Sequence, residues 1–253
     1  MADDIPFAST ILLLRDRPEE LEVLMVQRHR NMKFMGGALV FPGGKVDPAD
    51  EAAVPYTTGN NDDEAIRIAG IREVFEESGI LLARERGDGS FISDDHRHEV
   101  AVRHRERLDK GEMTMAELAK AENLDFATEM LVPFAHWITP PGAPRRYDTW
   151  FYVTRVPEDH THAHDGNESV DSVWIKPSQA LADEAAGKRE IVFPTRLNVA
   201  KLGRSKTVDD ALEAARNSTI VTVLPEMRDG MLHIPAEADY DLTEESVERA
   251  FHK

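Results

Sequence analysis

The stretch that most constrains this chain is "REVFEESGI", residues 72–80, where three glutamates crowd the end of one helix. A glycine directly after a periodic segment commonly ends a helix, so Gly79 marks the expected stop. Glu73, Glu76 and Glu77 then lie at positions i, i+3 and i+4 of one face. Like charges at this spacing repel by about 0.2–0.5 kcal/mol per pair, and anions near a helix C-terminus oppose the helix dipole by about 0.3–1 kcal/mol each. We therefore expect a positive charge beside this end of the helix.

The charge balance disfavours nucleic acid as a partner. The chain has 253 residues, and 30 Lys and Arg against 47 Asp and Glu give a formal net charge of -17. This excess repels a phosphate backbone, whereas local cations can still hold a small anionic substrate. The chain contains no cysteine, which excludes disulfides, thiolate metal sites and cysteine nucleophiles.

The first residues lack the features of a targeting segment. Asp3 and Asp4 stand where a signal peptide carries positive charge, and the apolar run 11–14 is too short for a secretory core or a membrane span. We expect a cytoplasmic protein that does not associate with membranes. A homodimer is compatible with the sequence, which does not specify an oligomeric state.

Hydrophobic patterning predicts an α/β chain. Two apolar runs, 9–14 and 21–27, flank the polar turn 15–20 and predict a β-hairpin. The segment 62–78 has the periodicity of a helix. Two further helices are predicted within a helical insertion at about 96–122, where Thr114 and Glu117 form a capping box.

Strands and helices also alternate in the second half of the chain. Strands are predicted within 129–140, 147–156 and 169–177, helices within 178–188, 194–202 and 207–217, and a hairpin turning at Asp229-Gly230. The pattern changes after Glu190. We therefore predict one domain over 1–190 and a C-terminal extension over 191–253 that packs on it.

From Glu64 to Ile80 the sequence resembles the Nudix box. That pattern runs glycine, five residues, glutamate, seven residues, then Arg-Glu-apolar-x-Glu-Glu-x-Gly-apolar, and only the first glycine is missing, since Thr58 occupies its place. The pair Gly43-Gly44 in "FPGGKVD" looks like the glycine turn of the family, which implies an insertion before the helix. A motif of this length is specific.

The resemblance implies an α/β/α sandwich, with a mixed sheet between helices, and hydrolysis of a nucleoside diphosphate linked to a group X. It implies Glu73, Glu76 and Glu77 as ligands of Mg²⁺ or Mn²⁺, with one of them also available as the base, and Arg72 as the residue that orients a glutamate. Independently, carboxylates clustered without basic partners suit a hard divalent cation. The alternative is a solvated acidic face. Glu64 either contributes through water or favours the helix N-terminus.

The segment 160–171, "HTHAHDGNESVD", holds further candidates. Nudix enzymes often draw an acid from outside the box, and we predict Glu168 in preference to Asp165; the alternative is a turn residue with an exposed neighbour. The alternating histidines also suit zinc, although this polar setting favours a loop. These histidines are His160, His162 and His164.

The segment before the glycine pair resembles the signature of coenzyme A diphosphatases in this superfamily. Arg28, Gly37 and "FPGG" fall in register, while His29 replaces a small residue and Lys33 replaces an arginine. Lysine keeps the charge but loses the bidentate fork. The predicted substrate-binding residues of this segment are Arg28, Lys33, Gly43 and Gly44.

Arg145 and Arg146 are a second candidate pair for substrate phosphate. Adjacent residues on a strand point to opposite sides, so one side chain would face the site. The alternative is an ion pair with Asp148 or with another of the abundant surface acids.

The helical insertion and the segments around it also resemble the acyl-CoA diphosphatase branch. The leading function is Mg²⁺-dependent hydrolysis of CoA or an acyl-CoA to 3',5'-ADP and (acyl)phosphopantetheine. The alternatives are a Nudix pyrophosphatase acting on ADP-ribose, dinucleotides or nucleoside triphosphates, and a non-catalytic nucleotide sensor. The intact acidic motif argues against the sensor.

Overall fold

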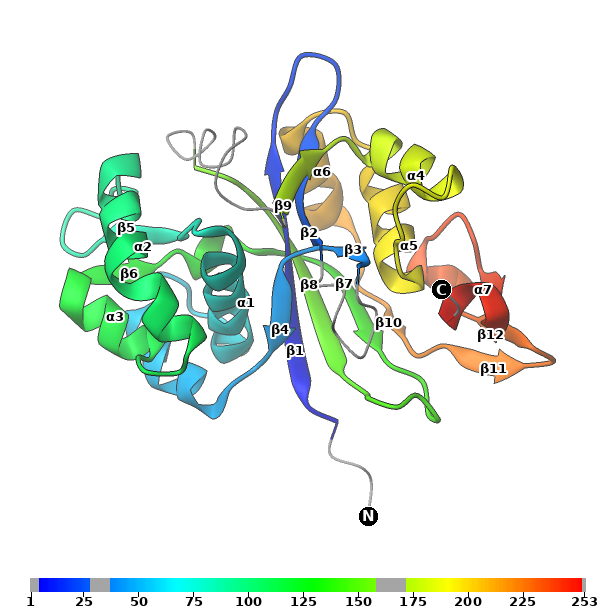
Figure 1. The fold of residues 1–253 in the computed structure, drawn as a ribbon, viewed down its shortest axis with the longest axis horizontal. Coiled ribbons are helices and arrows are strands. Elements are labelled where there is room, and N and C mark those ends of the chain that lie inside the picture. Colours follow the sequence, from blue (N-terminus) through cyan, green and yellow to red (C-terminus); the bar gives the residue numbers. More distant parts are fainter. Residues whose placement is uncertain (1–4, 28–36, 158–171, 252–253) are drawn as a thin grey trace.

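A mixed β-sheet lies between two groups of helices in the computed structural model, which describes residues 5–27, 37–157 and 172–251 (Figure 1). The strands are β1 (Phe7–Arg15), β2 (Glu22–Gln27), β3 (Leu39–Val40), β4 (Gly43–Lys45), β5 (Ala83–Glu85), β6 (Leu124–Phe126), β7 (Val132–Ile138), β8 (Asp148–Arg155), β9 (Ser172–Ile175), β10 (Thr222–Val223), β11 (Glu226–Arg228), β12 (Met231–His233) and β13 (Glu244–Ser246). The helices are α1 (Glu64–Ser78), α2 (Asp94–Asp109), α3 (Met115–Glu122), α4 (Pro177–Ala185), α5 (Phe193–Leu202), α6 (Val208–Asn217) and α7 (Val247–Phe251), with short 3₁₀ turns η1 (Pro48–Tyr56), η2 (Thr128–Met130) and η4 (Ala236–Ala238). The predicted α/β class with a mixed sheet is confirmed.

Strand β1 lies at the centre of the main sheet. It pairs in parallel with β8 along its whole length, and its other edge pairs antiparallel with β2 near Leu14 and with β4 near Ser9. The predicted hairpin of β1 and β2 is confirmed. Strands β7 and β10 continue the sheet beyond β8. Because β4 shares the edge of β1 with β2, the segment that carries Gly43 and Gly44 is fixed to the sheet.

Side chains of β1 alternate between two cores. Ile11 and Leu13 pack into the core beneath α1, α2 and α3, whereas Leu12 and Leu14 pack into the core beneath α5 and α6. Figure 1 shows these two groups of helices on opposite faces of the sheet. A strand covered on both faces is apolar throughout rather than alternating, which explains the run of consecutive apolar residues in the sequence.

The two helices predicted within 96–122 are confirmed as α2 and α3. Thr114 and Glu117 form the predicted capping box of α3, and Ser93 accepts from the backbone of His96 at the start of α2. Both helices lie on the α1 side of the sheet (Figure 1). Within the described ranges, no helix has the length and apolar character to cross a membrane.

Residues after 190 share the core of the sheet. Helices α5 and α6 contribute Leu197 and Leu212 to that core, and β10 adds a strand parallel to β7. The predicted hairpin at Asp229-Gly230 is confirmed, because β11 and β12 pair across two residues with φ of 51° and 77°. The division of the chain at 190 stays a prediction.

One buried network joins the sheet to the C-terminal residues. Trp137 of β7 donates its indole N–H to the Tyr240 hydroxyl at 2.9 Å, and this hydroxyl donates to Asn198 Oδ1 of α5 at 2.7 Å. Tyr240 and Trp137 are 8% and 4% exposed. Removing the hydroxyl would therefore leave two buried polar groups without a partner.

We expect Tyr240→Phe to lower the free energy of unfolding by about 1–3 kcal/mol, since a buried donor and a buried acceptor lose their partner. Chemical denaturation of the purified variants measures this loss. Tyr56→Phe is the matched control, because the Tyr56 hydroxyl makes no hydrogen bond with the described residues. Equal stability of the two variants would show that the network does not hold the C-terminal residues in place.

Candidate functional site

The end of α1 is fixed by Gly79, as predicted. Gly79 has φ of 74° and donates its N–H to the carbonyl of Phe75 at 2.8 Å. This left-handed conformation strongly favours glycine over residues with a side chain. The helix therefore stops one residue after Ser78, and Glu73, Glu76 and Glu77 occupy its last turns beside β4.

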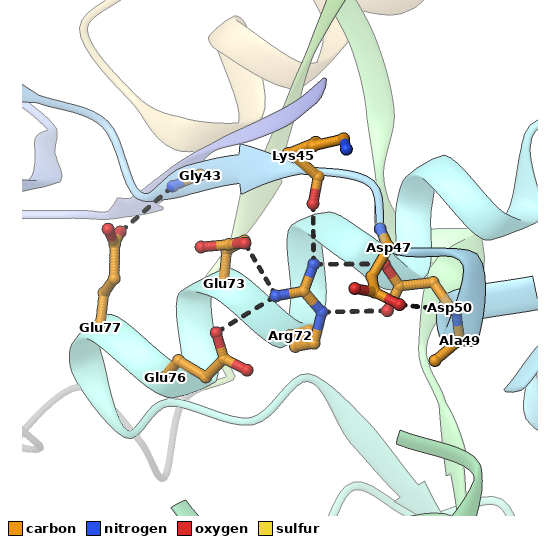
Figure 2. Close-up of polar contacts among 9 residues, drawn as sticks. All are labelled: Gly43, Lys45, Asp47, Ala49, Asp50, Arg72, Glu73, Glu76 and Glu77. Carbon is orange, nitrogen blue, oxygen red and sulfur yellow. Dashed lines mark hydrogen bonds and ion pairs between the residues drawn. The ribbon is translucent and has the colours of Figure 1, made fainter. Parts of the chain in front are cut away.

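The guanidinium of Arg72 lies between four residues that accept its hydrogen bonds (Figure 2). Its Nη1 donates to Glu73 Oε1 at 2.8 Å and to Glu76 Oε2 at 3.2 Å, and its Nη2 donates to the carbonyl of Lys45 at 2.9 Å. Its Nε donates to Asp50 Oδ1 at 3.0 Å. The expectation of carboxylates without basic partners is therefore wrong for Glu73 and Glu76, which share Arg72 Nη1 as a donor.

Asp50 was not identified from the sequence. It is 2% exposed and its Oδ2 also accepts from the backbone N–H of Asp47 at 2.9 Å, which completes a capping box at the start of η1. The spacing "DPAD" of residues 47–50 is the local signal for that cap. Its second role, holding Arg72, depends on the packing of η1 against α1 and has no local signal.

Gly43 and Gly44 lie in strand β4 rather than in a turn, so that expectation is wrong. Backbone pairing with β1 holds them, opposite Thr10 and Ser9. A Cβ on Gly44 would stand 2.4 Å from the carboxyl carbon of Glu73, and the N–H of Gly43 donates to Glu77 Oε2 at 3.2 Å. A side chain at position 43 would collide with the backbone of β1, and one at position 44 would displace the carboxylate of Glu73.

The carboxylates of this face are electrostatically strained. Burial raises the pKa of Glu76 to about 7, opposed by the charge of Arg72 and reinforced by Glu73 and Asp109. Burial also raises the pKa of Glu73, against the charge and hydrogen bond of Arg72. Burial acts to lower the pKa of Arg72, but the hydrogen bond to Asp50 and the charges around it outweigh burial, and this pKa lies above its ordinary value. One arginine therefore does not neutralise the acids, and further positive charge would be stabilised here.

The donor chemistry of this face suits a hard cation, since all three side chains present carboxylate oxygens. As the side chains stand, the described residues contain no group of three or more acids or histidines placed to hold a metal ion. Figure 2 shows the reason: Glu73 and Glu76 turn toward Arg72, while Glu77 turns toward Gly43. The residue types fit a divalent ion, and their convergence on one would require side-chain rotation.

Glu64 lies at the opposite end of α1. Its Oε1 accepts from the backbone N–H of Asn61 at 3.0 Å and from Asn61 Nδ2 at 2.7 Å, and the side chain is buried. Its Oε2 is buried and has no hydrogen-bond partner in the described ranges. These contacts fit the expected role at the helix N-terminus.

Arg145 and Arg146 lie in the loop before β8 rather than on a strand, so the expectation of strand alternation is wrong. Arg145 lines a cavity of about 220 Å³ with Trp137 and Phe151, which belong to the core beneath α5. Arg146 donates its Nε to the carbonyl of Thr139 at 2.9 Å. Asp148 contacts His136 at 2.5 Å instead, so neither arginine forms the ion pair considered from the sequence.

The remaining candidates lie outside the described residues. They are Arg28, Lys33, Glu168, Asp165 and the histidines His160, His162 and His164.

Comparison with known proteins places this geometry in a family. The family model of the NUDT19 Nudix domain matches residues 53–202, more than half of the chain. A putative nudix hydrolase 7 from Caenorhabditis elegans is 29% identical over 189 residues, which cover 74% of this chain and 57% of that protein. The chain thus spans little more than half of that relative.

Two further relatives are named acyl-coenzyme A diphosphatase NUDT19. The Xenopus laevis protein is 24% identical over 91% of this chain and 75% of its own length, and the human protein is 26% identical over 85% and 71%. Among solved structures, a NUDIX hydrolase from Alicyclobacillus acidocaldarius superposes with a TM-score of 0.67 at 25% identity, covering 84% of this chain and 97% of that one.

The match to the family model, the sandwich architecture and the acidic last turns of α1 agree with one another. Nudix hydrolases generally use divalent metals and act on small nucleotide substrates. The chain belongs to the Nudix hydrolases, in the family of the NUDT19 Nudix domain.

Proposed function

We propose that this chain hydrolyses the diphosphate of CoA or an acyl-CoA, in the presence of Mg²⁺ or Mn²⁺, to 3',5'-ADP and (acyl)phosphopantetheine. The observation that carries the proposal is the acidic face of α1, where Glu73, Glu76 and Glu77 meet β4 and Arg72 is anchored by Asp50. The substrate class is supported by the curated relatives named acyl-coenzyme A diphosphatase.

In this proposal Glu73, Glu76 and Glu77 hold the metal ion. A bound divalent ion supplies charge neutralisation at the diphosphate and lowers the pKa of the attacking water. Arg72 orients Glu73 and Glu76 through its Nη1, and Asp50 fixes the guanidinium in turn. Water attacks a phosphorus atom and the bridging P–O bond breaks. The water's proton passes to a carboxylate, for which Glu76, Glu77 and Glu168 are the candidates.

Substrate recognition is proposed to draw on cations outside α1. Arg28 and Lys33 follow β2 in the sequence and precede β4, whose Gly43 and Gly44 lie close to β1 and to the acidic face of α1. Arg145 lines an apolar cavity that would accept a pantetheine or acyl arm, and Arg146 follows it in the chain. A cytoplasmic location and a homodimer also stay predictions from the sequence.

We expect Glu76→Gln and Glu77→Gln to lower turnover by several orders of magnitude, since each removes a proposed metal ligand. The metal-free variant Glu76→Gln should melt no lower than the wild type at pH 8. In the wild-type protein the folded-state pKa of Glu76 is raised to about 7. Ionisation of Glu76 therefore opposes folding at pH 8, and replacing it with glutamine removes this destabilisation.

Steady-state kinetics with Mg²⁺ and melting curves in EDTA measure the two effects. Glu213→Gln on α6 is the matched control, because this exposed side chain makes no hydrogen bond or ion pair with the described residues. Near-normal turnover combined with a large loss of metal-free stability would assign the glutamates a structural role.

The substrate is tested by a panel. We expect a higher kcat/KM for CoA or an acyl-CoA than for ADP-ribose, NADH, a diadenosine polyphosphate or any dNTP. CoA adds a 3'-phosphate for the cations and a pantetheine arm for an apolar site, both of which ADP-ribose lacks. Chromatography of the products, with EDTA as the metal-free control, provides the measurement.

Each other outcome of the panel has its own meaning. Turnover confined to ADP-ribose or NADH would overturn the CoA assignment and keep the hydrolase. Tight nucleotide binding without turnover of any member would favour the non-catalytic sensor.

A further inference from the structure

A second arginine lies over the end of α1, and it comes from the helical insertion. Helix α2 packs against α1, and Arg105 of α2 donates its Nε to the carbonyl of Glu76 at 2.8 Å. Its Nη1 stands 3.5 Å from the position that a Cβ on Gly79 would occupy. The guanidinium is therefore stacked over the last turn of α1, beside the acidic face.

The charge of Arg105 is poorly compensated. Burial lowers its pKa, while the charges of Asp109 and Glu77 act in the opposite direction from beyond ion-pair distance. Within the described ranges, no carboxylate lies within 4 Å of its guanidinium and the bond to Glu76 is its one hydrogen bond. A half-buried guanidinium has five N–H groups and stabilises the fold little when most of them lack acceptors.

The other arginines of α2 either form ion pairs or are exposed to solvent. Arg97 donates to the carbonyl of Gly79 at 2.9 Å and pairs with Asp94, so it already caps the end of α1. Arg103 pairs with Glu122. Arg107 is exposed. Capping of α1 therefore accounts for the Nε of Arg105 but not for its Nη groups, which make no hydrogen bond with the described residues.

The last turn of α2 also reaches the acidic face electrostatically. The charge of Asp109 raises the pKa of both Glu73 and Glu76. Residues 105 and 109 are one turn apart on α2 and share a face. The charges of this last turn of α2 therefore act on the same end of α1 that carries the acidic face.

We infer that Arg105 binds the substrate diphosphate through its Nη groups and is a substrate-binding residue of the reaction. The inference rests on the proposed function for the location of the diphosphate. An arginine fork suits two phosphate oxygens at once. The diphosphate is favoured over the 3'-phosphate because Arg105 contacts the same turn of α1 that carries Glu76 and Glu77.

The test compares Arg105→Ala, Arg105→Lys and the matched control Arg107→Ala. We expect Arg105→Ala to lower kcat/KM by about 10- to 100-fold, the range of a hydrogen bond to a charged group. The loss should be equal for CoA and dephospho-CoA. Arg105→Lys should recover part of the lost kcat/KM. Arg107→Ala should keep the kcat/KM of the wild type. Mn²⁺ affinity without nucleotide, measured by paramagnetic resonance, should stay within twofold of the wild type.

Four results would overturn the inference. The first is an unchanged kcat/KM in Arg105→Ala, and the second is an equal loss of kcat/KM in Arg107→Ala. The third is a loss of kcat/KM confined to CoA, which would assign Arg105 to the 3'-phosphate. The fourth is a parallel loss of Mn²⁺ affinity, which would assign Arg105 a positioning role on α1. Calorimetric titration of ADP with Mn²⁺ gives a readout without turnover, in which Arg105→Ala should weaken binding. Wild-type protein that binds ADP but hydrolyses no substrate would contradict the proposed function and leave the inference to this titration.

Discussion

The ion pair between Arg72 and Asp50 connects the parts of the site. Asp50 is 2% exposed and the Arg72 side chain 14% exposed, so both charges are largely removed from water. Loss of one partner in such a pair typically costs about 3–5 kcal/mol, because the other is left buried and uncompensated. Through this pair η1 is fixed to α1, and the guanidinium is held where Glu73, Glu76 and the carbonyl of Lys45 all reach it.

The surrounding fold brings a strand and a second helix to the same place. Backbone pairing with β1 holds β4 so close to α1 that a side chain on Gly44 would displace the carboxylate of Glu73. From the other side, α2 brings Arg97 and Arg105 to the carbonyls at the end of α1. These positive charges partly offset the repulsion among the glutamates. The raised pKa of Glu76 indicates that they do not cancel this repulsion.

The elements with local signals could be predicted from the sequence. Gly79 marked the end of α1, the Thr114 capping box marked α3, and Asp229-Gly230 marked the hairpin. The cluster of acids was visible because 3.6-residue periodicity places it on one face. Asp50 and Arg105 were not identified individually, because their roles depend on how η1 and α2 pack against α1. The strand conformation of Gly43-Gly44 depends likewise on pairing with β1, which is remote in sequence.

The central claim is that Arg72 only partly compensates the charges of Glu73 and Glu76, so that a divalent ion is stabilised beside them. A ¹³C NMR titration of the glutamate carboxyls in metal-free protein tests it, with Glu76→Gln used to assign the resonance. The account predicts that Glu76 titrates near pH 7, and that Mg²⁺ moves this titration to lower pH, because the ion competes with the proton. Titration of Glu76 near pH 4.5 with no response to Mg²⁺ would contradict it.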